Sequence, residues 1–449
     1  MPQSVQNTTP EVIYAPDTAA QVGNFQAKPS PLTIAADILS RMLTVTVAPR
    51  DVALVSTTVI TTLSVFFFLR YVLYPKWRKV IPSPMRASFP KVSPESLAKQ
   101  VYHPEVLPGA RDVKTPYGTI RVYEFGNQNG PKVLMIHGIS TPCITLAPLA
   151  ESLAARGCRV MVLDLFGRGF SDGVGDLPHD ERLYTTNILL ALASSPLPWT
   201  GDRAFKLIGY SLGGALAASF ATTFPNLIDS LVLLAPAGLI RAADFGVMAR
   251  VMFRSGLVPE RILAMATKKR LQRPIAATTK PRARPSLKQE TSATEQIAEV
   301  AISETSAAEV PPQETPLEIR VDEYVRWMVT HHAGFVPAFM SCIRHAPLTD
   351  QHPTWETLGQ VMGAGRVAVL LGEKDEIIDW CDYERDGLPL LGGRERVHWK
   401  VLGGSHDFVM THVDDILREM KTAWSMGGTE HDGRCRHLKG RSSAANLSA

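Results

Sequence analysis

The stretch FKLIGYSLGGALAASFA, residues 205–221, decides the fold of this chain. Its apolar start, 205–210, predicts a buried strand, and the small-residue pattern that follows, 212–224, predicts a helix with no linker between them. A serine at such a junction lies on a tight, strained turn that lifts its hydroxyl clear of the sheet edge. Glycines two residues to either side leave room for crowded backbone that a Cβ would meet. The pattern therefore makes Ser211 a candidate nucleophile and the N–H of Leu212, at a helix N-terminus, a candidate oxyanion donor. A glycine-containing turn with an idle serine is the alternative.

Size and composition are those of a globular protein. The chain has 449 residues, of which 45% are hydrophobic and 20% charged, enough to bury a sizeable core. Its net charge of +4 is too small for this length to favour a nucleic-acid partner. The five cysteines are an odd number without metal-ligand spacing, which favours free thiols in a reducing compartment. They are Cys143, Cys158, Cys342, Cys381 and Cys435.

One segment is long and apolar enough to cross a membrane. Residues 52–69, VALVSTTVITTLSVFFFL, carry no charge and are bounded by Asp51 and Arg70. As a helix they cover about 27 Å, close to the thickness of a hydrocarbon core. We therefore expect a transmembrane helix over 51–74, inserted through 52–74; a buried core helix or a long strand is the alternative. Lys and Arg are denser after this span than before it, which places the C-terminal side in the cytosol. We therefore expect a single-pass membrane protein of the endoplasmic reticulum or another internal membrane.

Three segments lack hydrophobic periodicity. Two are expected to be disordered tails, and the third, rich in Pro, Lys and Ser, is expected to be a linker. They are the N-terminal tail 1–50, the C-terminal tail 426–449 and the linker 75–104.

Between these segments, strand and helix patterns alternate over 105–240 and again over 361–425. This order predicts a mostly parallel sheet with helices on both faces. The intervening residues, 241–360, carry helical patterns at 245–258 and 324–343 that predict a cap. A low-complexity insertion within them, 275–318, is expected to be disordered.

Three elements of the core have distinctive patterns. Residues 118–126 alternate like a half-buried strand, and 146–157 predict an amphipathic helix closed by Gly157. Residues 409–425 predict one closing amphipathic helix.

A serine nucleophile needs a histidine base, which in turn needs a carboxylate. Catalytic groups of a parallel sheet gather at the C-terminal ends of its strands, and Asp375 and His406 each follow one of the last two predicted strands. The order Ser211, Asp375, His406 is one of three known for this triad. Glu376 or Asp379 could replace Asp375. The histidines that compete with His406 lie elsewhere: His398 within a strand, and His331 and His332 in a cap helix.

A second oxyanion donor is expected in the loop that begins His137-Gly138-Ile139-Ser140. Gly138 permits a tight turn and Ile139 offers its backbone N–H, with Ser140 as the neighbouring alternative and a plain turn as the other. The later loop DLFGRGFSD, 164–172, is expected to be structural, with Arg and Asp side chains holding loops around the site.

The motifs HGIS, DLFGRGFSD, GYSLGG, GEKDEII and GGSHDF together resemble the successive signatures of the α/β-hydrolase fold superfamily. The resemblance covers about 105–425 apart from the insertion. It implies an eight-stranded sheet, a helical cap between strands six and seven, and Ser211, Asp375 and His406 as the triad. It extends to the subgroup with a single-residue HG-x oxyanion turn, which contains carboxylesterases, monoacylglycerol lipases, C–C bond hydrolases and some acyltransferases. Epoxide hydrolases and haloalkane dehalogenases are disfavoured because they use an aspartate where this chain has Ser211.

The expected function is that of a membrane-anchored serine hydrolase that cleaves a carboxylic ester, of a lipophilic acyl substrate, through an acyl-enzyme. The sequence implies no metal or organic cofactor, and it gives no indication of the oligomeric state. An acyltransferase or a C–C bond hydrolase with the same triad is the alternative, and a catalytically silent membrane scaffold is the rival from another class.

Overall fold

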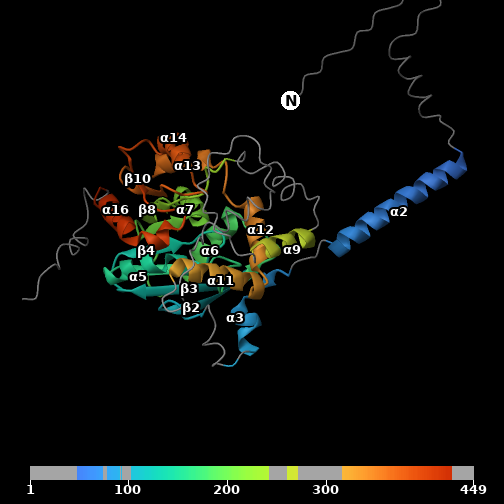
Figure 1. Ribbon diagram of the computed structural model, residues 1–449, viewed down its shortest axis with the longest axis horizontal. Coiled ribbons are helices and arrows are strands. Elements are labelled where there is room, and N and C mark those ends of the chain that lie inside the picture. The colour runs from blue at the N-terminus through green and yellow to red at the C-terminus, as the bar shows by residue number, and fades with distance from the viewer. Residues whose placement is uncertain are drawn as a thin grey trace, which may run out of the picture. The chain divides into compact units, whose positions relative to one another are not determined.

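The computed structural model (Figure 1) describes residues 48–73, 78–91, 93, 103–241, 260–271 and 316–426. They divide into two units, one that ends at Arg70 and one that begins at Tyr71. Several predictions lie outside the described residues: most of both tails, the helical pattern 245–258, the insertion up to residue 315, and Cys435.

The first unit contains the helix α2, Pro49–Leu73, up to Arg70. Among the described residues it is the one helix long and apolar enough to cross a membrane. Its apolar side chains are exposed along its length, for example Leu54 at 71% and Phe68 at 66%. The hydroxyls of Thr57 and Thr58 donate to the carbonyls of Ala53 and Leu54 at 2.7 and 2.8 Å, so these polar groups are satisfied within the helix.

The second unit is built on an eight-stranded sheet, as predicted, in the order β10-β9-β8-β7-β4-β5-β3-β2. The strands from β10 to β5 are parallel, while β3 is antiparallel to β5 and β2 is antiparallel to β3. This order puts β7, which leads to Ser211, at the centre of the sheet. The strands are β2 Ala110–Thr115, β3 Gly118–Gly126, β4 Lys132–Ile136, β5 Arg159–Leu163, β7 Phe205–Tyr210, β8 Ile228–Leu234, β9 Val367–Gly372 and β10 Val397–Leu402.

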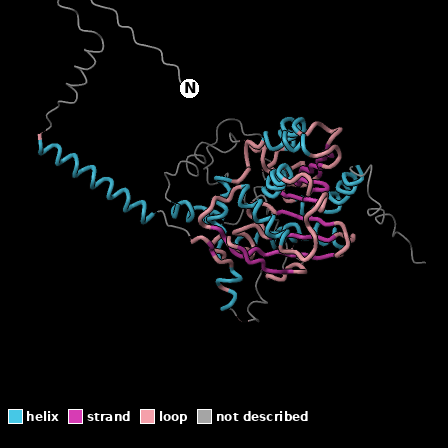
Figure 2. The backbone as a smooth tube through the Cα atoms, turned by 180° about the vertical axis from the view of Figure 1, so that it is seen from behind, coloured by secondary structure: helices cyan, strands magenta, loops and turns pink. Residues whose placement is uncertain are grey.

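Helices cover both faces of the sheet, which confirms the predicted layers (Figures 1 and 2). On one face α5 packs on β3 and β5, and α16 packs on β9, β10 and α5. On the other face α7 packs on β7 and β8 and contacts both α6 and α13, while α14 contacts α13. The helices are α5 Ala147–Ala155, α6 Glu181–Ala193, α7 Leu212–Thr223, α13 His352–Val361, α14 Trp380–Leu390 and α16 Val413–Met426.

The cap is inserted between β8 and β9, the sixth and seventh strands of the sheet in chain order. Its described helices are α9 Glu260–Leu271, α11 Leu317–His331 and α12 Phe335–His345, and α9 contacts both of the others (Figure 1). The pattern at 324–343 is therefore two helices rather than one, and His332 lies just beyond α11 instead of within a helix. The predicted end of the insertion, 318, is also wrong, because α11 buries its apolar face from Val321 onward and extends back to Leu317.

Part of the predicted linker is ordered. Residues 78–91 contain β1 Val80–Ile81, α3 Pro84–Ala87 and the 3-10 turn η1 Phe89–Lys91. β1 pairs with β6 Gly173–Val174. The Ser83 N–H donates to Asp172 at 2.7 Å, and the ring of Phe89 lies 5.8 Å from Phe170 and 5.9 Å from Trp327. Local composition resembles a linker, but these contacts with distant residues order the segment.

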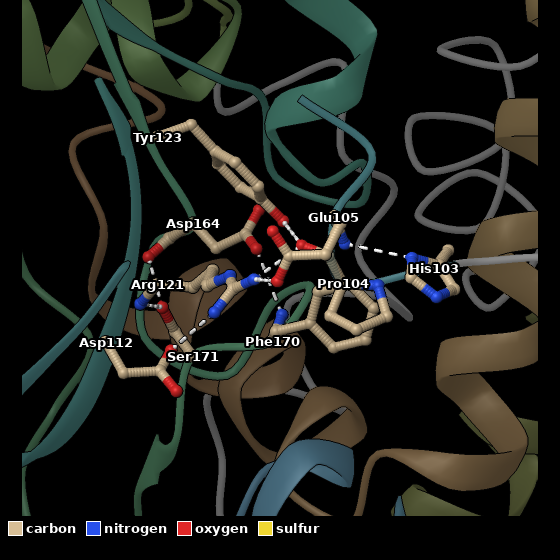
Figure 3. A network of polar contacts seen from close by, with 9 residues as sticks. All are labelled: His103, Pro104, Glu105, Asp112, Arg121, Tyr123, Asp164, Phe170 and Ser171. Carbon is tan, nitrogen blue, oxygen red and sulfur yellow. Dashed lines mark hydrogen bonds and ion pairs between the residues drawn. The ribbon is translucent and has the colours of Figure 1, made fainter. Parts of the chain in front are cut away.

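Two further patterns were misleading. β3 is buried along both faces up to Gly126, because its polar side chains find partners instead of water. Arg121 donates to the Pro104 carbonyl at 2.6 Å and to the carboxylate of Asp112 at 3.0 Å (Figure 3). The closing helix is divided into α15 Phe408–Thr411 and α16, because the backbone at His412 leaves the helical region (φ −121°, ψ 40°).

The helix end at Gly157 is as predicted: α5 ends at Ala155, and Gly157 has φ 91°.

Candidate active site

Ser211 occupies the turn between β7 and α7 in a backbone conformation that is costly for a residue with a side chain. Its φ of 54° and ψ of −120° lie outside the regions that L-residues favour. Hydrogen bonds hold the turn from both sides. The Ser211 N–H donates to the Leu234 carbonyl at 3.0 Å, and the Ser211 carbonyl accepts from the N–H groups of Gly214 and Ala237, each at 2.9 Å. The surrounding strands and helix thus enforce the strained turn.

The flanking glycines are required by close backbone approaches. A Cβ on Gly209 would lie 2.3 Å from the Gly213 carbonyl oxygen, and a Cβ on Gly213 would lie 2.2 Å from the Ile136 carbonyl oxygen. Both distances are far below van der Waals contact. The second approach also places the start of α7 directly against the end of β4.

Ser211, His406 and Asp375 form a continuous hydrogen-bonded chain. His406 Nε2 lies 3.1 Å from Ser211 Oγ, and His406 Nδ1 lies 2.7 Å from Asp375 Oδ2. The His406 and Asp375 side chains are fully buried. A carboxylate only accepts hydrogen bonds, so His406 carries its proton on Nδ1 and Nε2 can accept from the Ser211 hydroxyl. The structure brings together all three residues that the sequence singled out.

The last two strands deliver the histidine and the carboxylate. β9 and β10 are parallel neighbours, so the loops that follow them leave the same edge of the sheet. The Glu373 N–H donates to the Leu402 carbonyl at 2.8 Å and the Lys374 N–H to the Gly404 carbonyl at 2.9 Å, which ties the two loops together. Asp375 Oδ1 then accepts from the N–H groups of Ile377 and Ile378, at 2.9 and 2.8 Å, which fixes the carboxylate.

The alternative acids and bases have other partners. Asp379 caps α14 by accepting from the Cys381 N–H at 2.8 Å. Glu376 was the other alternative to Asp375, and burial raises the pKa of its carboxyl group. Of the competing histidines, His398 pairs with Glu419 at 2.8 Å.

Tyr210 contacts His406 in a way that the sequence did not reveal. Its hydroxyl donates to the His406 carbonyl at 3.1 Å, and the two rings lie 5.2 Å apart. The residue before Ser211 therefore also holds the loop that carries His406. In the sequence, the position of Tyr210 directly before Ser211 was the one feature that could have drawn attention to it.

The HG-x loop lies beside the turn that carries Ser211. His137 Nδ1–H donates to the Gly138 carbonyl at 2.8 Å, and Nε2 accepts from the Leu165 N–H at 2.9 Å. Burial lowers the pKa of His137 to about 3, so its imidazole is neutral and structural. A Cβ on Gly213 would lie 2.6 Å from the His137 carbonyl oxygen, so the loop and α7 are in direct contact. Ile139 follows in this loop and is 1% exposed. The roles of Ile139 and Leu212 as oxyanion donors stay predictions.

The loop over 164–172 holds its neighbours through buried polar contacts. Asp164 accepts from the Cys143 N–H at 3.0 Å, and Asp172 accepts from the Thr119 N–H at 2.7 Å. Figure 3 shows Asp164 receiving the Phe170 N–H within the same loop, at 3.0 Å. Arg168, which the sequence grouped with these aspartates, bonds instead to backbone carbonyls and to neutral side chains.

No disulfide links the cysteines in the described part of the chain: Cys143, Cys158 and Cys342 are buried and Cys381 is exposed. No cluster of three or more His, Cys, Asp or Glu side chains in that part could hold a metal ion.

Comparison with known proteins identifies relatives of the core. Residues 128–302 match the family described as serine aminopeptidase, S33. An uncharacterized protein of Mycobacterium tuberculosis is 28% identical over 162 residues, 36% of this chain and 43% of that protein. A mouse serine hydrolase-like protein is 29% identical over 120 residues, 26% of this chain and 37% of its own length. The pimeloyl-[acyl-carrier protein] methyl ester esterase of Chromobacterium violaceum is 36% identical over 106 residues, 24% and 37% of the two chains.

The regions that match this chain thus cover less than half the length of each of these three relatives. Among solved structures, a candidate lipase of Acinetobacter baumannii superposes with a TM-score of 0.50 at 15% identity, covering 72% of this chain and 92% of that one. The sheet order, the cap position and these matches agree: the chain has the α/β-hydrolase fold.

Proposed function

We propose that the protein is a membrane-anchored serine hydrolase that cleaves a carboxylic ester through an acyl-enzyme. One observation carries the proposal: Ser211 Oγ, His406 and Asp375 form a chain of hydrogen bonds of 3.1 and 2.7 Å at the C-terminal edge of the sheet. A base within hydrogen-bond distance of a hydroxyl, itself oriented by a buried carboxylate, is the arrangement that activates a serine nucleophile.

In the first half-reaction Ser211 Oγ attacks the ester carbonyl while His406 Nε2 takes its proton. Asp375 stabilises the resulting imidazolium and, because its other oxygen is held by two backbone N–H groups, keeps the ring oriented. His406 then gives the proton to the departing alkoxide, and the acyl group stays on Ser211. In the second half-reaction a water attacks the acyl-enzyme with His406 again as base.

The negative oxygen of each tetrahedral intermediate requires donors. We assign this role to the N–H groups of Leu212 and Ile139. Leu212 is the first residue of α7, where an N–H has no acceptor within the helix and the helix dipole favours negative charge. Ile139 lies in the loop against which α7 begins, as the Gly213 approach to the His137 carbonyl shows.

An ester substrate is favoured by similarity to the methyl ester esterase of C. violaceum over 106 residues. The lipophilic character of the substrate rests on α2 alone. Its 25 residues cover about 37 Å at about 1.5 Å per residue, more than the roughly 30 Å of a hydrocarbon core. A span of this length, apolar on every side, would keep the enzyme at a membrane. The excess of Lys and Arg after the span favours a cytosolic body.

The test is hydrolysis of p-nitrophenyl esters of increasing chain length by the full chain in detergent, beside Ser211→Ala. We expect the wild type to release p-nitrophenol, with a preference for the longer acyl chains, and Ser211→Ala to show none at the same folded fraction. Adding an alcohol acceptor separates hydrolysis from acyl transfer by the products formed. Cleavage of aminoacyl p-nitroanilides without ester cleavage would contradict the proposal.

A further inference from the structure

The guanidinium of Arg168 is fully buried and is hydrogen-bonded to the HG-x loop. It stands in the loop after β5 and has 0% exposure. Its Nε donates to the Ile139 carbonyl at 2.8 Å, and one terminal nitrogen donates to the Phe166 carbonyl at 3.2 Å and to the Tyr184 hydroxyl at 3.1 Å. The other terminal nitrogen donates to the Cys342 sulfur at 3.3 Å. The side chain therefore joins the HG-x loop to α6 and to the cap helix α12.

Every acceptor around this cation is electrically neutral. Within the described part of the chain no carboxylate forms an ion pair with Arg168. The two acidic members of its own loop have other partners: Asp164 accepts from the backbone N–H groups of Cys143 and Phe170, and Asp172 accepts from those of Ser83 and Thr119 and pairs with Arg86. A buried cation without an anionic partner is costly, so its presence calls for a compensating role.

The positive charge also acts on its surroundings. Burial, and after it the charge of Arg168, lowers the pKa of His179 to about 3. The same two effects lower the pKa of His137. The field of the guanidinium thus extends to the histidine that begins the HG-x loop.

The hydrogen bond to Ile139 controls the direction of a peptide group. In a trans peptide the C=O and the following N–H point in opposite directions. The Gly138 carbonyl is held by His137 Nδ1, so the Ile139 N–H points away from His137. The Ile139 carbonyl is held by Arg168, so the Ser140 N–H points away from the guanidinium. Two successive carbonyls are thus held by buried donors, and neither peptide can turn its oxygen toward the nucleophile without losing a buried hydrogen bond.

We propose that Arg168 is a positioning residue for the oxyanion site: it holds the HG-x loop with its N–H groups turned to the reacting carbonyl and adds an uncompensated positive charge behind them. This inference rests on the proposed function, since it concerns the same ester hydrolysis. Arg168 touches no reacting atom and acts through the Ile139–Ser140 peptide.

The chain offers a matched control. Arg121 is another buried arginine, 3% exposed, and Figure 3 shows its guanidinium among Pro104, Glu105 and Asp112. The hydrogen bonds of its guanidinium go to these three residues, so Arg121→Met removes a buried arginine of the same fold without releasing the Ile139 carbonyl. Arg168→Met removes the same atoms and does release it, and Arg168→Lys restores a charge and one donor.

The experiment measures kcat and KM for a p-nitrophenyl ester and the inhibition constant of an alkyl boronic acid, whose tetrahedral adduct carries a negative oxygen. Active sites are counted by end-point fluorophosphonate labelling, so that loss of folded protein is not read as loss of rate. We expect Arg168→Met to lower kcat per active site by about tenfold to hundredfold, to change KM little, and to weaken boronate binding by the same factor as kcat/KM. Arg168→Lys should recover part of both losses, and Arg121→Met should lower the melting temperature with both constants per active site kept.

Equal kcat and equal boronate affinity in Arg168→Met and wild type would overturn the inference while leaving the proposed function intact. A loss of kcat without a matching loss of boronate affinity would overturn it as well. Absence of ester hydrolysis by the wild type would overturn the proposed function, and this inference with it. If Arg168→Met does not fold, Arg168→Gln, which is too short to hold Ile139 and Cys342 together, is put through the same two measurements.

Discussion

Replacing Asp375 by Asn exchanges donor and acceptor in the hydrogen bond between residue 375 and His406 Nδ1. Asp375 Oδ1 accepts two backbone N–H groups, from Ile377 and Ile378. An asparagine keeps both bonds only if its carbonyl oxygen stays there, which turns its NH₂ group toward His406 Nδ1. His406 must then accept at Nδ1 and carry its proton on Nε2, where it can no longer take the proton of Ser211.

The opposite amide orientation does not rescue the variant. It would direct the NH₂ group at two backbone N–H donors and leave both without an acceptor, at about 1–3 kcal/mol each, or roughly 2–6 kcal/mol in total. We therefore expect kcat to fall by about 10³–10⁴, the size of effect that a wrong histidine tautomer produces in a serine triad. That is roughly 4–5.5 kcal/mol of transition-state stabilisation at about 1.36 kcal/mol per decade.

The assay is steady-state hydrolysis of a p-nitrophenyl ester, with folded protein quantified by circular dichroism. Asp379→Asn is the matched control, because Asp379 caps α14 and asparagine caps a helix about as well. It should keep kcat and change the free energy of unfolding little. A rate for Asp375→Asn within tenfold of the wild type would refute the proposed tautomer and with it the role of Asp375.

Three further predictions concern the packing of the body, its response to pH and the anchor. Phe89→Ala should lower the free energy of unfolding by about 3 kcal/mol or more in urea denaturation, since it removes a buried ring from the segment 78–91; a loss under about 1 kcal/mol would restore the linker interpretation. Burial holds the pKa of His137 and His179 at about 3 and that of His332 at about 4, below the ordinary 6.5, so the unfolded chain takes up these protons first. Stability should therefore fall from pH 7 to pH 5 by roughly 2 kcal/mol per histidine, and equal urea midpoints at the two pH values would contradict this. Deleting 49–73 should move the protein from the carbonate-washed membrane pellet to the supernatant with esterase activity kept, and retention in the pellet would argue against the anchor.

The core of the fold and the candidate site were predictable for the same physical reason. Parallel strands end at one edge of a sheet, so residues that follow different strands meet there although far apart in sequence. Asp375 and His406 are separated by 31 positions, and Ser211 and His406 by 195, yet each lies just past a strand that its apolar run reveals. The glycines around Ser211 could be predicted because their need is local.

What could not be predicted depends on contacts between elements whose local patterns carry no sign of them. Residues 78–91 are rich in Pro, Lys and Arg, as a linker would be, and are ordered by partners such as Asp172, 89 positions after Ser83. The bond between Arg168 and Cys342 spans 174 positions and links a loop to a cap helix. The alternation of β3 suggested one wet face, but ion pairs can replace water around a buried arginine such as Arg121.

The most direct test of the central claim is to map the adduct of a fluorophosphonate probe by peptide mass spectrometry in the wild type, in Ser211→Ala and in His406→Gln. Activation of one serine by its neighbouring imidazole predicts a single adduct on Ser211, none in Ser211→Ala, and labelling slowed by orders of magnitude in His406→Gln. An adduct on another residue, or undiminished labelling without the His406 imidazole, would show that these three side chains do not act together.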